Sequence, residues 1–130
     1  GKDKNQVFML EYGANIDEKD IVEHRFDYSD CLEILFLGVD WVRKGGELAV
    51  EIVNWLNERG IKAKLNIVGI RSLDDAIISN PHVQYYGFLN KNNSDDYAKL
   101  VSSIKKCHLL LLPTKAECSA IAFAEALSCS

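Results

Sequence analysis

The sequence predicts an α/β fold in which a Rossmann-like, doubly wound parallel sheet is covered by helices on both faces. Segments of strand length alternate with segments of helical periodicity through residues 33–130, which is typical of right-handed β-α-β units. Two of the strand segments, 33–39 and 108–113, hold continuous apolar runs, as expected of strands buried on both faces. Four such strands favour the strand order 3-2-1-4.

The first two strands and the helix between them are the clearest elements. Residues 33–39 (EILFLGV) are the first strand, and residues 47–59 carry apolar side chains at helical spacing. Gly60 stands where a left-handed residue commonly ends a helix. Residues 64–70 (KLNIVGI) are the second strand, and residues 74–79 are long enough for one or two helical turns.

The remaining elements continue the same alternation. Residues 83–88 (VQYYGF) are the third strand. Ser94 is expected to cap a helix that runs to Lys106, because acidic residues follow it and basic residues end the segment. Residues 108–113 are the fourth strand, and a final helix begins near Ser119.

The chain divides into a connecting segment and an incomplete domain. Residues 1–32 predict a short strand over 5–12 and a linker with a little helix, and residues 33–130 predict part of a Rossmann-like domain. The final helix runs to the last residue, whereas a complete doubly wound sheet normally has five or six strands. We therefore expect further strands and helices to complete the domain.

Composition excludes several classes of protein. With 130 residues, 48% of them hydrophobic, the chain can bury a core, and its net charge of -4 argues against a nucleic-acid partner. It has neither an apolar stretch of membrane-spanning length nor a secretory leader pattern. The four cysteines lack zinc-site spacing, which predicts free thiols in a cytoplasmic protein and no metal site.

Two loops are expected to meet at the point where the strand order reverses, between the first and fourth strands. The loop over 40–46 offers Arg43, Lys44 and Gly45 just before a helix, where cations and backbone N–H groups suit phosphate. The alternative is an ordinary basic turn with a glycine at a helix start. The loop over 114–119 would lie beside it.

Glu125 is the most informative residue of the final helix. Its neighbours over 120–127 are apolar nearly all round, so the helix should be buried and the carboxylate must find a partner. Helical side chains lean toward the N-terminus, which would aim Glu125 at the ends of the strands, where a carboxylate can accept hydrogen bonds from two ribose hydroxyls. The alternative is a glutamate on a narrow exposed stripe.

Four motifs in the same order resemble the donor-binding domain of family-4 retaining glycosyltransferases of GT-B fold. Glu117 and Glu125 form an E-x7-E pattern within PTKAECSAIAFAEALS, which is similar to the signature of that family. ILFLGVDWVRKGGELAVE resembles its first strand and phosphate loop. KLNIVGI and HVQYYGFLNKNN resemble its second and third strands, and VFMLEYGANID resembles the segment that joins its two domains.

The resemblance implies a role for each matching residue, in retaining transfer of a sugar from a nucleoside diphosphate to an acceptor hydroxyl. Lys44 would bind the diphosphate and Glu117 would face the sugar, both as catalytic residues. Glu125 would hold the ribose. The other implied donor-binding residues are Arg43 and Gly45 in the phosphate loop, Ser119, Ala120 and Ile121 at the helix start, and Ile70, Phe88 and Leu89 around the base.

The same resemblance implies partners and an alternative. No cofactor or metal is expected beyond the nucleotide-sugar donor, the acceptor would bind an N-terminal domain outside this chain, and peripheral membrane association of the whole protein stays open. Val39 stands where many members have arginine, so either Arg43 supplies that charge or the diphosphate is held more weakly. Val39 also leaves open that the chain is a catalytically degenerate nucleotide-binding or interaction module. Cys118, often glycine in the family, is expected to be a small packing residue rather than a nucleophile.

Two other α/β classes fit poorly. A dinucleotide-dependent dehydrogenase needs G-x-G-x-x-G after the first strand, where this chain has GVDWVRKGG. A receiver-like signalling domain needs an aspartate at the end of the third strand, where Tyr86 and Gly87 stand.

Overall fold

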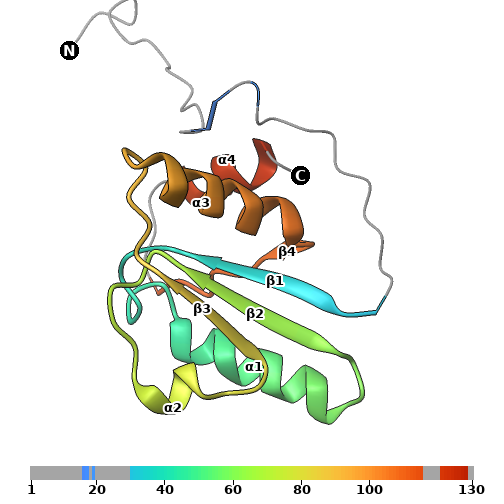
Figure 1. The fold of residues 1–130 in the computed structure, drawn as a ribbon. Helices are drawn as coiled ribbons and strands as arrows, with labels where there is room; N and C mark the ends of the chain where they lie inside the picture. Colours follow the sequence, from blue (N-terminus) through green and yellow to red (C-terminus); the bar gives the residue numbers. More distant parts are fainter. Residues whose placement is uncertain (1–15, 18, 20–29, 116–120, 129–130) are drawn as a thin grey trace, which may run out of the picture.

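A computed structural model of the chain describes residues 16, 17, 19, 30–115 and 121–128. Strands and helices alternate along the described part (Figure 1), as the sequence predicts. The elements are β1 (Leu32–Leu37), α1 (Gly46–Glu58), β2 (Ala63–Val68), α2 (Asp75–Ile78), β3 (Val83–Gly87), α3 (Ser94–Lys106), β4 (Leu109–Leu110) and α4 (Ile121–Ser128). The predicted strand over 5–12 and most of the predicted linker lie outside the described residues.

The four strands form one parallel sheet in the order β3-β2-β1-β4, which confirms the predicted order. β1 pairs with β2 along its whole length, from Leu32 opposite Ala63 to Leu37 opposite Val68. β4 pairs with β1 only at Ile34 and Leu35. β2 and β3 therefore follow on one side of β1 and β4 lies on the other, so the order of the strands reverses between β1 and β4, where a Rossmann-like sheet opens a crevice.

Helices cover both faces of the sheet, α1 and α2 one face and α3 and α4 the other (Figure 1). The core under α1 is built on fully buried side chains such as Ile34, Phe36 and Leu65. The core under α3 is built on the alternate strand positions, such as Leu35 and Val68. Because successive strand residues point to opposite faces, both faces of a continuous apolar run are used.

The predicted strand boundaries are too long at the carboxyl ends. β1 ends just before Gly38 and β2 just before Gly69, whereas we expected each strand to continue through its glycine. β4 has two residues instead of the predicted six. The fourth strand is short because the chain turns after Leu111: the Thr114 amide donates to the Leu112 carbonyl at 2.8 Å. Pro113, which has no N–H for the ladder, lies in that turn.

The predicted cap of α3 is one residue out. Asn93, not Ser94, is the N-cap, and its Oδ1 accepts hydrogen bonds from the amides of Asp95 and Asp96 at 3.0 and 3.1 Å. Both residue types are good caps, so the helix start was predictable and the choice between neighbours was not. The helix spans Ser94–Lys106 and ends at Lys106, as predicted.

The final helix is less buried than its sequence predicts. Ala122 and Glu125 face inward, but Ile121 and Phe123 are 42% and 45% exposed. The expectation of burial all round was therefore wrong for the side of α4 that carries Ile121 and Phe123. The inward position of Glu125 holds nevertheless.

Candidate functional site

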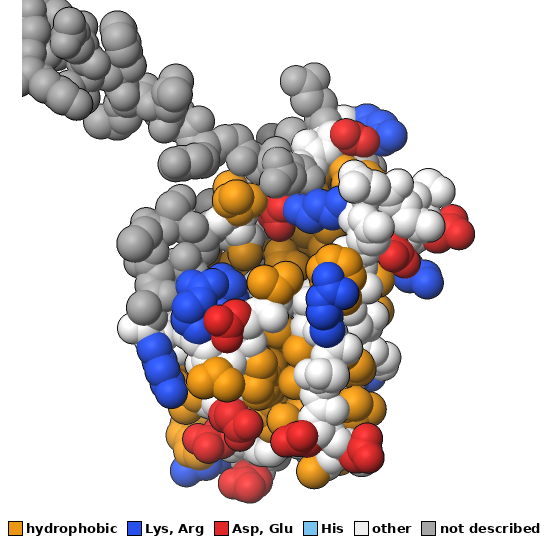
Figure 2. Space-filling view, turned by 90° about the vertical axis from the view of Figure 1, so that its left-hand side faces the viewer, with side chains coloured by type: hydrophobic (Ala, Val, Ile, Leu, Met, Phe, Trp, Pro, Cys, Tyr) orange, Lys and Arg blue, Asp and Glu red, His pale blue; other side chains and the backbone are white. Residues whose placement is uncertain are grey.

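A cavity of about 550 Å³ opens at the carboxyl ends of the strands, where α4 approaches the loops after β1 and β3. Figure 2 shows this end of the molecule, with Lys and Arg side chains on both sides of a band of hydrophobic side chains. The lining is mostly apolar and includes four charged side chains; it consists of Leu37, Gly38, Val39, Arg43, Lys44, Val68, Gly69, Phe88, Leu89, Lys91, Leu100, Ile121, Ala122 and Glu125. Cavities of this size and composition are typical of small-molecule sites.

The loop after β1 folds back on itself around Asp40. Asp40 Oδ1 accepts a hydrogen bond from the Arg43 amide at 3.0 Å, and its carboxylate lies 3.4 Å from Arg43 Nε. The Asp40 carbonyl accepts from the Lys44 amide at 3.1 Å. The amides of Gly45 and Gly46 likewise donate to carbonyls within the loop, so these three amides are not available for phosphate. The side chains of Arg43 and Lys44 supply the positive charge instead.

Gly45 joins the loop after β1 to the loop after β4, as predicted from the strand order. Its φ of 73° is left-handed, and a Cβ there would lie 2.1 Å from the Pro113 carbonyl oxygen. Next to this contact, the Lys115 amide donates to the Arg43 carbonyl at 3.0 Å. Only glycine allows both this conformation and this approach, so Gly45 fixes the position of the two cations before it.

Lys44 is a buried lysine that lines the cavity. Its side chain is packed across Gly38: a Cβ on Gly38 would lie 2.3 Å from Lys44 Cδ. Lys44 is only 7% exposed, which is rare for a lysine. The packing against Gly38 holds the aliphatic part of its side chain in place. An ammonium group on so restrained a side chain is well suited to a single anionic ligand.

Glu125 lies on the inward side of α4 and is 4% exposed, which confirms the buried alternative over the exposed stripe. Its Oε1 contacts Nζ of Lys91, from the loop between β3 and α3. A buried carboxylate must be paired, and here the pair sits in the wall of the cavity. The sequence suggested ribose hydroxyls as the partner of this carboxylate; the structure shows a lysine.

The residues predicted for the base pocket divide into two groups. Phe88 and Leu89 line the cavity, and the Arg71 guanidinium lies 4.1 Å from the centre of the Phe88 ring. Ile70 does not line the cavity: it is 3% exposed and packs in the core under α1. The Ile70 carbonyl, which accepts a hydrogen bond from Tyr85 Oη at 2.9 Å, is likewise held within the protein.

The start of α4 contributes Ile121 and Ala122 to the cavity wall. The N-terminal end of the helix, which carries partial positive charge, therefore lies at the cavity. Glu117, Ser119 and Ala120 were also predicted for this site, and they lie outside the described residues.

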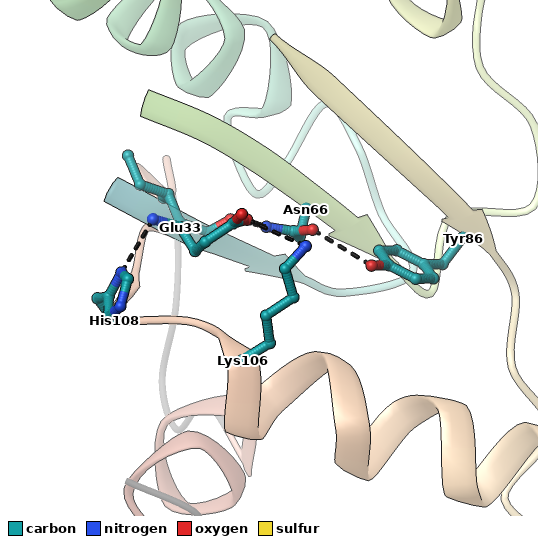
Figure 3. A network of polar contacts seen from close by, with 6 residues as sticks. Glu33, Asn66, Tyr86, Lys106 and His108 are labelled. Atoms are coloured by element: carbon teal, nitrogen blue, oxygen red, sulfur yellow. Dashed lines mark hydrogen bonds and ion pairs between the residues drawn. The ribbon is translucent and has the colours of Figure 1, made fainter. Parts of the chain in front are cut away.

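A second polar cluster lies under α3 near the amino ends of the strands (Figure 3). Asn66 is 0% exposed in the middle of β2; its amide donates to Glu33 Oε2 at 2.6 Å, and Tyr86 Oη lies 3.4 Å from its Oδ1. Lys106 Nζ is 3.3 Å from the same Glu33 oxygen, and His108 Nδ1 accepts from the Glu33 amide at 3.0 Å. Every member has a partner within the protein, so the cluster is structural.

The described cysteines are unreactive by environment. Cys31 and Cys107 are free thiols, as predicted. Burial, and secondly the negative charge of Glu33, raises the pKa of Cys107 to about 12. The same two causes, in the same order, raise the pKa of Cys31. Because the thiolate is the reactive form, neither residue is placed to act as a nucleophile. Cys118 and Cys129 lie outside the described residues.

Sequence reasoning missed three residues of note, Lys91, Arg71 and Asn66. Lys91 and Arg71 are charged residues in loops, and nothing in their neighbours distinguishes them from other surface charges. Asn66 carried a signal, since it interrupts the apolar pattern of the second strand. A polar residue there must find a buried partner.

Two searches of the described residues gave nothing: no helix is long and apolar enough to cross a membrane, and no three His, Cys, Asp or Glu side chains cluster in a way that could hold a metal. Comparisons of the chain with known protein families, with curated proteins and with solved structures give no match.

Proposed function

We propose that this chain binds a nucleoside diphosphate sugar, as the donor-binding part of a retaining glycosyltransferase of GT-B type. The observation that carries the proposal is that Lys44, from the loop after β1, and Glu125, from α4, line one cavity. These residues are 81 positions apart in the sequence, and only the predicted strand order places them together. The four motifs that resemble family-4 glycosyltransferases support the same function.

The chemistry of the cavity suits the three parts of such a ligand. Phe88 and Leu89 offer apolar surface for a base, and Glu125 offers carboxylate oxygens for the ribose hydroxyls. Arg43 and Lys44, with the N-terminal end of α4, offer positive charge for the diphosphate. A ligand with an apolar ring, a diol and two phosphates would use all of them.

The proposed mechanism follows from where charge develops. As the bond between sugar and diphosphate breaks, negative charge builds on the diphosphate oxygens. Lys44 is held rigidly by its packing on Gly38, so it can stabilise that charge without reorganisation. The sugar passes through an oxocarbenium-like state. Glu117 would face this sugar, a role that rests on the resemblance alone.

The direct test is a calorimetric titration of the chain with UDP, GDP and ADP, and with the matching nucleosides. We expect one diphosphate to bind clearly more tightly than the other two and than its own nucleoside. If all three diphosphates fail to bind, or if inorganic pyrophosphate binds as well as the best of them, the proposal is wrong.

A second candidate is a degenerate module that binds nucleotide without catalysis. Val39 favours it: this residue is 68% exposed in the cavity wall, at the position where many members of the resembled family carry arginine. A transfer and donor-hydrolysis assay on the full-length protein separates the two functions. Nucleotide binding without turnover supports the degenerate module, and turnover excludes it.

A further inference from the structure

Lys91 forms an ion pair with Glu125, the carboxylate that the proposed function assigns to the ribose hydroxyls. Lys91 Nζ contacts Oε1 of Glu125, and the two residues belong to different elements, the loop after β3 and α4. The Glu125 side chain is 6% exposed and that of Lys91 is 39% exposed. The lysine thus reaches in from the surface to cover a buried carboxylate.

A ligand that uses Glu125 must share or replace this contact. Breaking the pair without compensation would leave an ammonium group in a cavity that already contains Arg43 and Lys44. These are the charged groups that line the cavity with the pair, and both are positive. Arg43 is itself paired with Asp40, so the cost of releasing Lys91 is the lost contact with Glu125, which negative charge on the ligand can offset.

We propose that Lys91 is a specificity-determining residue that exchanges Glu125 for the ligand's diphosphate. The inference rests on the proposed function and adds to it a coupling between two parts of the ligand. The ribose takes the carboxylate, and the released ammonium turns to the phosphates, which a flexible side chain with three donors can reach from several directions. A nucleoside without phosphates gains the ribose contact with Glu125 but offers no partner to the released ammonium group. Its affinity is therefore lowered by more than the loss of direct phosphate contacts.

The test is Lys91→Met, which keeps most of the side-chain length and removes the charge. We expect the best-binding nucleoside among uridine, guanosine and adenosine to bind roughly three- to tenfold more tightly to the variant, because no pair has to be broken. The matching diphosphate should bind equally or less tightly. The ratio of diphosphate to nucleoside affinity should therefore fall by at least the same factor.

Two variants serve as controls. Lys62→Met removes the same charge from an exposed residue before β2, at the other end of the sheet, and should leave the ratio unchanged. Lys91→Arg keeps the charge and should restore the wild-type ratio. A thermal melt of each variant shows that it is folded before it is titrated.

The outcomes separate the two proposals. Nucleotide binding by the wild type together with an unchanged ratio in Lys91→Met overturns the role of Lys91 and leaves the proposed function standing. Equal tightening of nucleoside and diphosphate also overturns it. A stability cycle of Lys91→Met and Glu125→Gln checks the pair without any ligand, and independent effects would overturn the inference. If the wild type binds no nucleotide, both proposals fail together.

Discussion

Glu125 shows how the surroundings of one residue can restrict its role. It is a carboxylate with its side chain turned into the molecule, on a helix whose other inward side chains are apolar. Leaving such a group unpaired is costly, so a structural pairing and a ligand contact are the two ways to keep it charged. The structure shows the first, through Lys91, and the cavity makes room for the second.

Glu125→Gln tests the second way. The substitution keeps the shape but replaces one acceptor oxygen by a donor, so we expect the affinity for a ribonucleoside diphosphate to fall by roughly 1–3 kcal/mol. A 2′,3′-dideoxy nucleotide should bind the wild type about as weakly, and the mutation should then cause little further loss. Calorimetry of the four combinations gives the answer. Losses that simply add would show that Glu125 does not touch the ribose.

Lys44→Met tests the phosphate end of the same cavity. Methionine keeps the packing against Gly38 and removes only the ammonium group. We expect diphosphate affinity to fall by roughly 1.5–3 kcal/mol, with little change for the nucleoside, which has no phosphate to lose. The measurement is the same pair of titrations. Equal losses for both ligands would mean that Lys44 acts through the fold.

At the residue level, the sequence predicted the properties that depend on adjacent residues in the chain. The burial of Glu125 was predictable because the residues on either side of it are apolar. The pairing of Glu125 with Lys91 was not predictable, because the two are 34 positions apart and the sequence contains several other lysines. Ile70 was placed in the base pocket by the family resemblance, but it packs in the core on the face covered by α1.

Among the elements, the start of α1 depends most on a single backbone conformation. Gly45 has no side-chain cap to offer, and it begins the helix in a left-handed conformation against the Pro113 carbonyl. The contact ties two loops that come from the strands on either side of the reversal point. Any side chain at this position would push the loops apart.

Gly45→Ala and Gly60→Ala separate strain from crowding. The φ angles are similar, 73° and 80°, but a Cβ at Gly60 has no neighbour within 4 Å. We expect Gly60→Ala to lower the free energy of unfolding by about 1–2 kcal/mol, the cost of a left-handed alanine. Gly45→Ala should cost roughly 1–3 kcal/mol more, from crowding. Urea denaturation measures both. Equal losses would show that the Pro113 contact yields easily.

The cap of α3 offers a second test on an element. Asn93→Ala removes the acceptor for two amides and should lower the free energy of unfolding by about 1 kcal/mol. Ser94→Ala, at the residue that the sequence suggested as the cap, should change it by less than about 0.5 kcal/mol. Chemical denaturation of the two variants compares them directly. The opposite ranking would place the cap at Ser94.

Element types were predictable here and element ends were not. Continuous apolar runs identified the strands, but such runs carry no alternation that marks where pairing stops. Side-chain periodicity identified α1, although two of the residues that supported it, Leu48 and Trp55, are about half exposed, 47% and 50%. The short β4 ends at the turn around Pro113, where the Thr114 amide donates to the Leu112 carbonyl.

For the molecule as a whole, polar chemistry is divided between the two ends of the sheet. The cavity with its charged residues lies at the carboxyl ends of the strands, and the cluster around Asn66 and Glu33 lies toward the amino ends. The order of the strands could be predicted because four strands that alternate with helices favour the Rossmann-like order, which the sheet has. The second cluster was not predicted, since its members come from four separate segments of the chain, around residues 33, 66, 86 and 106–108.

The proposed function makes a prediction for the intact chain. The reacting centre of a GT-B enzyme lies between two domains, and the acceptor would bind the domain that this chain does not contain. We therefore expect the purified chain to bind a nucleoside diphosphate sugar without transferring the sugar to any acceptor. Chromatographic detection of transferred sugar checks this. Transfer by the chain alone would contradict the proposal that donor and acceptor bind to different domains.

The Asn66 side chain has a consequence for how the strands find their alignment. Apart from Glu33, Lys64 and Asn66, the residues of β1 and β2 are apolar on both faces. Without these polar residues, a slip of one residue between the strands would exchange one set of apolar side chains for another at little cost. Asn66 removes that freedom. Slipped by one position, its amide would turn to the face under α1, away from Glu33 and among aliphatic side chains without a hydrogen-bonding partner. One buried amide thus disfavours a shifted register between β1 and β2.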